Sequence, residues 1–422
     1  MSLPRRTVAV LPCFILLCTL VLTGVVATGT AYAANPETNR VATWNMQVGR
    51  DRWQGAANLA RDNTVLALQE VPNEPPAGAR YVGTIGNTID HYEWDVARGV
   101  TRSLFILYTT SRNLGMVTAW MPNEIVEVDG PYRPALMVTR PTDDVAFASI
   151  HAAAGSGFDV RQLVENVAHE ATGRGLNHWA VAGDFNRDPS DALRITLPPD
   201  ARVYNSGQAT QRSGNELDYM ISNVNTEDWQ ATVHGNQGSD HWPVSFTALR
   251  AGALPPELTI HADNSDRLLD VFQGNNTNGT HVITYHDNGA ANQRWRLQAI
   301  GTSTSTGHPM YRIMSSDNGK CLDVNRGQQS GWGDYLNIWD CHDIDGVPGS
   351  GGNQRDTQNF TLEHPNPRMP NLTMLRNNAT GLYANIAGNN RNDGAWVVQW
   401  GDQWGNRAAP NESFYLHPLT NG

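Results

Sequence analysis

The C-terminal part of the chain repeats a short pattern three times. The units begin with RLLDV (267–271), KCLDV (320–324) and LYANI (382–386), and they close with NQRW (292–295), QNF (358–360) and ESF (412–414). Asn and Gly are dense in this region, helical periodicity is absent and short β runs recur. Because one such unit cannot bury its apolar face alone, the repeat predicts an all-β domain built from three similar units over residues 258–420.

The chain before this repeat has a different texture. Short apolar runs occur at 40–44, 64–70, 103–109, 135–139, 145–152, 178–185, 217–222 and 243–249. Between two of them, Val160, Leu163, Val164 and Val167 recur at helical spacing. Strands interspersed with a few helices predict an α/β or α+β sandwich over residues 35–250. The proline-rich AGALPP marks a linker at residues 251–257.

The first residues resemble an export signal. Arg5 and Arg6 precede an apolar run from Val8 to about Val26, and small residues follow at Ala31 and Ala33. This order predicts a signal peptide over residues 1–34 and a secreted mature chain without a transmembrane segment. A membrane anchor is the alternative interpretation, and the paired arginines leave Sec and Tat export both open.

Cleavage after Ala33 would remove two of the four cysteines, Cys13 and Cys18. Cys321 and Cys341 would remain, and an even pair in an exported chain favours a disulfide.

The charge balance limits how the chain can bind nucleic acid. The whole chain carries 30 Lys and Arg against 41 Asp and Glu, a formal charge of −11. Residues 35–250 hold 17 Arg and no Lys against 25 acids. This composition argues against tight non-specific binding of duplex DNA, because that binding depends on many cationic contacts to phosphates. It does not argue against hydrolysis of a phosphoester at a metal site, where the ion supplies positive charge locally.

Polar side chains end most of the apolar runs in the first domain. They are Asn45, Glu70, His151, Asp184, Asn186, Asp218, Asp240 and His241. Each has an ordinary structural interpretation, such as a buried histidine in a core or an Asx-turn. Together they supply the oxygen ligands of a hard divalent cation and an acid–base pair, which phosphoester hydrolysis requires.

The residue types suggest a division of roles. Glu70 with Asn45 or Asp240 offers oxygen ligands to one Mg²⁺ ion. Asp218 and His241 form a credible acid–base pair, since a carboxylate orients an imidazole and stabilises its protonated form. His151 and Arg133 would hold the phosphate oxygens, because the planar guanidinium binds phosphate through two hydrogen bonds.

The first domain resembles the endonuclease/exonuclease/phosphatase superfamily, which includes deoxyribonuclease I, and more closely the active B component of cytolethal distending toxins. The resemblance lies in ATWNMQ (42–47), LALQE (66–70), YRPALMV (132–138), SIHAAAGSGFD (149–159), WAVAGDFNRDPS (179–190), TQRSGNELDYMIS (210–222) and SDHWPVSF (239–246). It implies an α/β four-layer sandwich and a hydrolase that depends on Mg²⁺, with Mn²⁺ or Ca²⁺ as alternatives.

The resemblance also implies a role for each residue, listed here by role: Asn45, Glu70 and Asp240 on the metal side; Arg133 as a phosphate contact; His151 and His241 as catalytic histidines; Asp218 as the partner of His241; Asp184 and Asn186 as groups that position the water and the scissile phosphate. DNA is the implied substrate, and phosphoinositide is the alternative.

The second domain resembles the ricin-type β-trefoil lectins. Their QxW signature stands as QRW at 293–295 and decays to QNF and ESF in the later repeats. The resemblance implies sugar sites in which an aromatic ring stacks on a pyranose while Asp and Asn fix its hydroxyl groups. The implied sets are Asp270, Tyr285 and Asn292; Asp323 and Trp339, with Thr357 in place of Asn; and Asn385, Trp400 and Asn411. The alternative is that these residues only hold the trefoil core. The Cys321–Cys341 pair lies where this family places a disulfide within one repeat.

Three functions remain open from the sequence. The first is a secreted nuclease of the toxin-B type that docks to glycans through its own lectin domain, with a further toxin component possible but not required. The second is a secreted phosphodiesterase or phosphatase acting on lipid or sugar phosphates. The third is a glycan-binding protein whose first domain is inactive.

Overall fold

The structure is a computed structural model, and it describes residues 36–154, 159–226, 229–248, 257–325, 329–342, 356–404 and 409–419. The predicted signal peptide (1–34) and all of the predicted linker except Glu257 lie outside the described residues. Within those described ranges, no helix has the length and apolarity needed to span a bilayer.

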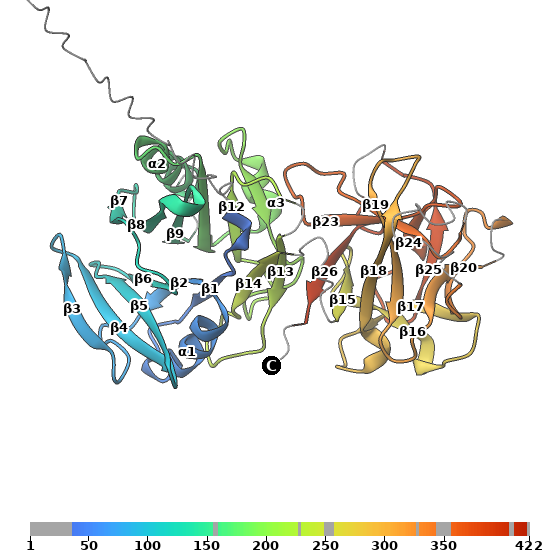
Figure 1. Cartoon of the computed structure of the whole chain (residues 1–422), viewed down its shortest axis with the longest axis horizontal. Helices are drawn as coiled ribbons and strands as arrows, with labels where there is room; N and C mark the ends of the chain where they lie inside the picture. Colours follow the sequence, from blue (N-terminus) through green and yellow to red (C-terminus); the bar gives the residue numbers. More distant parts are fainter. Residues whose placement is uncertain are drawn as a thin grey trace, which may run out of the picture. The chain divides into compact units, whose positions relative to one another are not determined.

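Two β-sheets form the first part of the chain (Figure 1). One has the strand order β13-β14-β1-β2-β6-β5-β4-β3, and the other has the order β11-β12-β10-β9-β8-β7. The strands of the first are β1 (Val41–Asn45), β2 (Val65–Val71), β3 (Arg80–Ile85), β4 (Ile89–Ala97), β5 (Val100–Leu107), β6 (Asn113–Thr118), β13 (Trp229–Val233) and β14 (Val244–Ala248). Those of the second are β7 (Ile125–Val128), β8 (Ala135–Arg140), β9 (Val145–His151), β10 (His178–Asp184), β11 (Arg202–Tyr204) and β12 (Asp218–Ser222).

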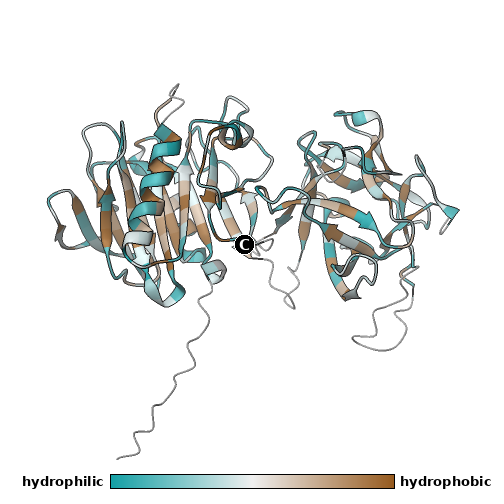
Figure 2. Ribbon diagram, turned by 90° about the horizontal axis from the view of Figure 1, so that it is seen from above, coloured by the Kyte–Doolittle hydropathy of each residue, from teal (hydrophilic) through white to brown (hydrophobic). Residues whose placement is uncertain are grey.

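One apolar core joins the facing sides of the two sheets. It includes Phe105 and Phe246 from the first sheet and Phe147 and Met220 from the second, all of them buried. Figure 2 shows this concentration of apolar residues along the strands. Because each strand sends alternate side chains to opposite faces, the same strands also carry a second apolar set outward.

Helices cover those outer faces. The helices are α1 (Trp53–Asp62), α2 (Asp159–Gly173) and α3 (Pro189–Arg194). α1 packs on the first sheet and α2 on the second. The predicted helical spacing is confirmed, since Val160, Leu163, Val164 and Val167 are all buried. The described chain is nevertheless mostly sheet, so the four-layer α/β sandwich itself stays a prediction.

The second part of the chain is all β, as predicted. Its strands are β15 (Leu258–Ala262), β16 (Arg267–Val271), β17 (Thr280–His286), β18 (Trp295–Thr302), β19 (Pro309–Ser315), β20 (Cys321–Val324), β21 (Leu336–Trp339), β22 (Phe360–Glu363), β23 (Leu372–Asn377), β24 (Tyr383–Ile386), β25 (Ala395–Trp400) and β26 (Phe414–Pro418). The closing aromatics Trp295, Phe360 and Phe414 of the three repeats are buried in one core.

The strand register shows that the three repeats are structurally equivalent. Asp270 pairs with Ile283 and Leu268 with Tyr285 in the first repeat. Asp323 pairs with Asn337 and Cys321 with Trp339 in the second, and Asn385 pairs with Val398 and Tyr383 with Trp400 in the third. In each hairpin the Asp or Asn and the aromatic residue therefore lie on the same face, one diagonal step apart.

Candidate functional site

Three of the predicted catalytic residues lie on one rung of the six-stranded sheet. His151 ends β9 and pairs with Asp184, which ends the parallel strand β10. Asp184 in turn pairs with Asp218, the first residue of the antiparallel strand β12. The ends of these three strands lie at one edge of the sheet. One imidazole and two carboxylates from segments far apart in the sequence therefore come together there.

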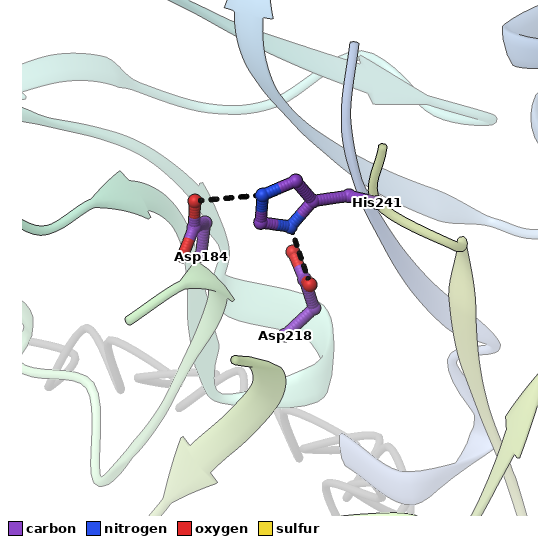
Figure 3. A group of neighbouring side chains, drawn as sticks. All are labelled: Asp184, Asp218 and His241. Atoms are coloured by element: carbon purple, nitrogen blue, oxygen red, sulfur yellow. Dashed lines mark hydrogen bonds and ion pairs between the residues drawn. The ribbon is translucent and has the colours of Figure 1, made fainter. Parts of the chain in front are cut away.

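His241 arrives from the other sheet, in the loop before β14. Its Nδ1 lies 2.8 Å from Oδ2 of Asp218, and its Nε2 lies 3.7 Å from Oδ2 of Asp184. Figure 3 shows the imidazole between the two carboxylates. Nε2 of His151 lies 3.4 Å from the same Asp184 oxygen. The four side chains thus form one buried cluster, and the predicted Asp218–His241 contact is present.

The two histidines differ in their electrostatic surroundings. Burial, together with the nearby charge of Arg133, lowers the pKa of His151 to about 3. Burial also acts to lower the pKa of His241, but the hydrogen bond and charge of Asp218 outweigh it and raise that pKa to about 9. A neutral imidazole therefore faces a protonated one across Asp184.

Asp184 is a buried carboxylate that lies close to both histidines. Burial, followed by the nearby charge of Asp218, raises its pKa to about 7. Its Oδ2 accepts a hydrogen bond from the Asn45 side chain at 2.9 Å, and its Oδ1 accepts one from the backbone N–H of Asn186 at 2.8 Å. Asn186 also donates to the carbonyl of Ala152 at 2.8 Å, so both asparagines hold the end of β10 in place.

The predicted metal-side residues lie beside this cluster. β1 and β2 run parallel, and Asn45 pairs with Gln69, so Asn45 and Glu70 reach the same edge of the eight-stranded sheet. Oε1 of Glu70 lies 3.8 Å from Nε2 of His151. Asp240 is half-buried, and its charge helps to raise the pKa of His241. Among the described contacts, however, none joins the carboxylate of Asp240 to Asn45 or Glu70.

Arg133 reaches the cluster from the loop before β8. One of its nitrogens donates to the carbonyls of His151 and Ala152, at 3.3 and 3.4 Å. These contacts hold the guanidinium at the end of β9; its role as a phosphate contact stays a prediction.

The first repeat of the second part brings together all three of its predicted sugar-binding residues. Both oxygens of Asp270 accept amide hydrogen bonds at 2.9 Å, one from Asn292 and one from Gln293. Asp270, Tyr285 and Asn292 line one cavity of about 410 Å³, together with Phe272 and Gly274. The three residues predicted from the sequence are therefore brought together.

The second repeat departs from this arrangement. Asp323 accepts from Gln358 at 3.0 Å, but Thr357 is buried where the first repeat has Asn292. Nε2 of His342 lies 4.0 Å from the Asp323 carboxylate. Trp339 is 43% exposed. The second repeat therefore has the carboxylate and the aromatic ring but lacks the asparagine amide of the first repeat.

The third repeat exchanges the acid and the amide. Asn385 stands where the other repeats have Asp, and Glu412 stands where they have Gln. The Asn385 amide donates to Glu412 at 2.9 Å, and Asn411 donates to the Asn385 carbonyl oxygen at 3.1 Å. The hydrogen bond between the two positions is kept, with its donor and acceptor reversed.

The predicted cysteine pair forms a disulfide. Cys321 and Cys341 are joined, with 5.1 Å between their Cα atoms. The bridge joins the first residue of β20 to Cys341, which follows the end of β21 within the second repeat.

Comparison with known proteins supports both parts. A family model described as "Ricin-type beta-trefoil lectin domain-like" matches residues 239–339. The B component of the cytolethal distending toxin of Escherichia coli is 28% identical, over 49% of this chain and 91% of the relative. A homolog of this B component from Salmonella typhi is 26% identical, over 51% and 91%. The solved cytolethal distending toxin of Actinobacillus actinomycetemcomitans is 26% identical, covers 51% of this chain and all of that chain, and has a TM-score of 0.46.

The chain is similar to the B component of cytolethal distending toxins. Its second part is similar to ricin-type β-trefoil lectin domains over the matched residues. The family match begins at residue 239, before β14. Because β14 pairs with β1 and β13, the structure places residues 244–248 in the first sheet and not in the trefoil.

Two polar residues beside the candidate cluster were missed by the sequence reasoning. Arg112 lies with its Nε 3.2 Å from Oε2 of Glu70. Thr210 donates to Oδ2 of Asp218 at 2.8 Å, and its hydroxyl accepts the backbone N–H groups of Leu217 and Asp218. Thr210 begins the TQRSG motif, which could have identified it. Arg112 follows an apolar run without a motif around it, so no sequence signal marked it.

Backbone strain surrounds the same site. Gln47, Val48, Glu70 and Asn186 all have positive φ angles, between 45° and 56°. At Glu70 the ladder between β2 and β6 contains a bulge. Non-glycine residues seldom adopt this conformation, and such strain concentrates at functional sites.

Proposed function

We propose that the chain is a secreted, metal-dependent phosphodiesterase that cuts DNA and docks to glycans through its trefoil. The observation that carries the first half is the buried cluster in which His241 contacts Asp218 and Asp184 while His151 contacts Asp184 and faces Glu70. Metal-assisted phosphoester hydrolysis needs an acid–base pair beside oxygen ligands for a metal ion.

The chain's own residues divide the work between proton transfer and positioning. Asp218 accepts the Nδ1 hydrogen of His241 and so fixes the ring with Nε2 directed toward Asp184. His241 is then placed to exchange a proton at Nε2. His151, Asn186 and Arg133 would hold the phosphate oxygens and the attacking water in line. The opposite pKa shifts of the two histidines agree with this division.

The donor set fits a hard divalent cation. Glu70 and Asn45 offer oxygen atoms at the ends of adjacent parallel strands, and Mg²⁺ prefers oxygen ligands. Asp184, Asp218 and His241 also place possible ligand atoms within 4.8 Å of one another. We favour the Glu70 side, because His241 and Asp218 already use their facing atoms on each other. Mg²⁺ held there would neutralise charge on the phosphate oxygens.

DNA is the substrate that the likeness to the toxin-B proteins favours. A phosphoinositide is the second candidate, because residues 35–250 hold no Lys and more acids than Arg. One phosphoinositide headgroup needs fewer cationic contacts than duplex DNA.

Carbohydrate binding is proposed for the trefoil on separate grounds. The first repeat combines a carboxylate, an amide and a half-buried tyrosine around one cavity. An aromatic face with polar groups beside it suits a pyranose, whose apolar face stacks while its hydroxyls bond. A fused lectin of this kind could replace separate binding components.

One set of assays tests the enzymatic proposal. Supercoiled plasmid and a panel of phosphoinositides are incubated with Mg²⁺ and with the unaltered chain, His151→Ala or His241→Ala. We expect the unaltered chain to nick plasmid and each variant to lose at least about 100-fold in rate, the usual range for removal of an acid–base group.

The matched control is His169→Ala, since His169 is an exposed histidine on α2 outside the cluster. Its activity should stay within about twofold of the unaltered chain. Phosphate release from phosphoinositides without nicking would assign the second substrate class. Inactivity on both substrates, with glycan binding retained, would leave a lectin with an inactive first domain.

A further inference from the structure

Trp332 is an exposed tryptophan in the loop between β20 and β21 of the second repeat. Its side chain is 67% exposed. It lies against Trp400 of β25 in the third repeat, with 5.3 Å between the ring centroids and 39° between the ring planes. The two indoles thus form one continuous aromatic surface that is contributed by two different repeats.

The loop that carries Trp332 is fixed to the third repeat by its backbone. Gly333 donates to the carbonyl of Gln399 at 2.8 Å, and Gln399 donates to the carbonyl of Asp334 at 2.8 Å. Gly401 leaves room for the ring, since a Cβ at that position would lie 2.7 Å from Cζ2 of Trp332. The position of the indole is therefore set by the fold and not by a free surface rotamer.

Comparison of the three repeats shows what is unusual about this residue. The glycine after it has counterparts in the other repeats, because Gly279, Gly333 and Gly394 have φ angles of 87°, 86° and 81°. The residues before these glycines are Asn278, Trp332 and Asp393. Each contacts the residue that follows the aromatic position of another repeat.

In two of the three places this contact is polar. Asn278 donates to the Asp340 carboxylate at 2.8 Å, and Asp393 accepts from Nδ1 of His286 at 2.7 Å. In the third place, the indole of Trp332 covers Gly401. Because a polar pair is enough to join neighbouring repeats, the contact itself does not require a large apolar ring that stays in solvent. Contiguous exposed apolar surface is a feature of binding sites, so the two rings are a candidate ligand platform.

Polar groups of the third repeat lie beside this surface. Asn385 and Trp400 share one face of the β24–β25 hairpin. Asn411 and Glu412 are hydrogen-bonded to Asn385. One pyranose on Trp400 could reach these groups, and a second could then stack on Trp332.

We propose that Trp332 makes the third repeat selective for saccharides of two or more pyranose units. This inference rests on the proposed carbohydrate binding of the trefoil. Trp400 with Asn385 and Asn411 would hold the first unit, and Trp332 would hold the next. The first repeat would accept a single unit, because Asp393, not an indole, stands at the equivalent position beside His286.

The test measures glycan affinity as a function of saccharide length. The full chain carries Tyr285→Ala and Trp339→Ala, which remove the aromatic platforms of the other two repeats. A glycan array of mono-, di- and oligosaccharides identifies ligands, and calorimetry then measures affinity for the best disaccharide and for its terminal monosaccharide. Trp332→Ala should weaken disaccharide binding by about 5- to 10-fold and change monosaccharide binding by less than about twofold. Trp332→Phe should keep most of the disaccharide affinity.

Tyr132→Ala is the matched control, because Tyr132 is an aromatic residue of nearly equal exposure, 66%, in the first domain. It should leave both affinities unchanged. Equal losses for the two ligands in Trp332→Ala would mean that Trp332 only supports the site. Tighter monosaccharide binding would mean that it shields Trp400. Either result overturns the inference, whereas the absence of any glycan ligand for the chain without substitutions would overturn the carbohydrate-binding proposal itself.

Discussion

At the scale of single residues, the exchange of acid and amide in the third repeat makes Asn385 and Glu412 a coupled pair. Asn385 and Glu412 keep the hydrogen bond that Asp and Gln make in the other repeats. Asn385→Asp alone would oppose two buried carboxylates and should lower the free energy of unfolding by about 2 to 3 kcal/mol. Adding Glu412→Gln recreates the pair of the first repeat and should recover most of the loss. Urea unfolding of the single and double variants measures this coupling. A double variant no more stable than Asn385→Asp would contradict the pairing.

The carboxylate of the first repeat should make sugar binding depend on pH. Burial raises the pKa of Asp270 to about 6, against the hydrogen bonds from Gln293 and Asn292. Sugar hydroxyls donate best to the ionised form, so affinity should fall as the pH drops through 6, by about tenfold at pH 5. Calorimetric titrations of Trp400→Ala/Trp339→Ala from pH 5 to 8 measure this effect on the first repeat alone. An affinity that is constant over that range would rule out Asp270 as the acceptor.

Candidate site residues could be identified from the sequence where a polar side chain stood at one end of an apolar run. That reasoning found His151, Asp184 and Asp218, which the structure places on a single rung. It could not find Arg112, because a turn between two strands sets its approach to Glu70. Contacts of that kind depend on how strands pair, and a single sequence does not display the pairing.

At the scale of elements, the disulfide ties together one hairpin of the trefoil. Cys321 and Cys341 are 20 residues apart and bridge β20 to the end of β21. Closing a loop of this length stabilises by about 3 kcal/mol in the chain-entropy account. Cys321→Ser/Cys341→Ser should therefore lower the free energy of unfolding of the trefoil by about that amount. Urea unfolding in non-reducing buffer measures it. The reduced unaltered chain should match the variant, and a variant as stable as the oxidised chain would contradict the estimate.

Elements were predictable from the sequence where burial produced an uninterrupted apolar run; β6 was missed although all of its residues are buried, because Asn113, Gly115 and Thr118 interrupt its apolar residues. β1, β2, β9 and β10 are almost continuously buried, and each was visible as an apolar run. β3 was not, because its residues are largely exposed and carry no apolar alternation. β1, β2, β9 and β10 carry residues of the candidate cluster, which is why the site could be predicted before the full sheet order.

For the whole molecule, the acidic balance suggests a particular mode of DNA binding. Residues 35–250 lack Lys, and the arginines that reach the cluster in the described contacts are Arg112 and Arg133. If about two phosphates are neutralised, affinity should fall only about tenfold between about 50 and 200 mM salt, whereas six to ten contacts would cost about 10³- to 10⁵-fold. The KM for plasmid nicking is measured at fixed Mg²⁺ across this range of salt. The slope of log KM against log salt concentration then gives the salt dependence.

The same experiment on Arg133→Ala gives the reference for one contact. For Arg133→Ala, the slope of log KM against log salt concentration should be smaller by about one than for the unaltered chain, because each phosphate contact contributes roughly that amount. His169→Ala, which changes no contact in the cluster, should keep the slope of the unaltered chain. A steep slope in the unaltered chain would show that a basic surface elsewhere in the chain binds the duplex. A slope unchanged in Arg133→Ala would remove Arg133 from the phosphate contacts. Under the proposed function, the net charge of −11 thus predicts a substrate complex in which a metal ion and a few arginines replace the broad positive surface of most DNA-binding proteins.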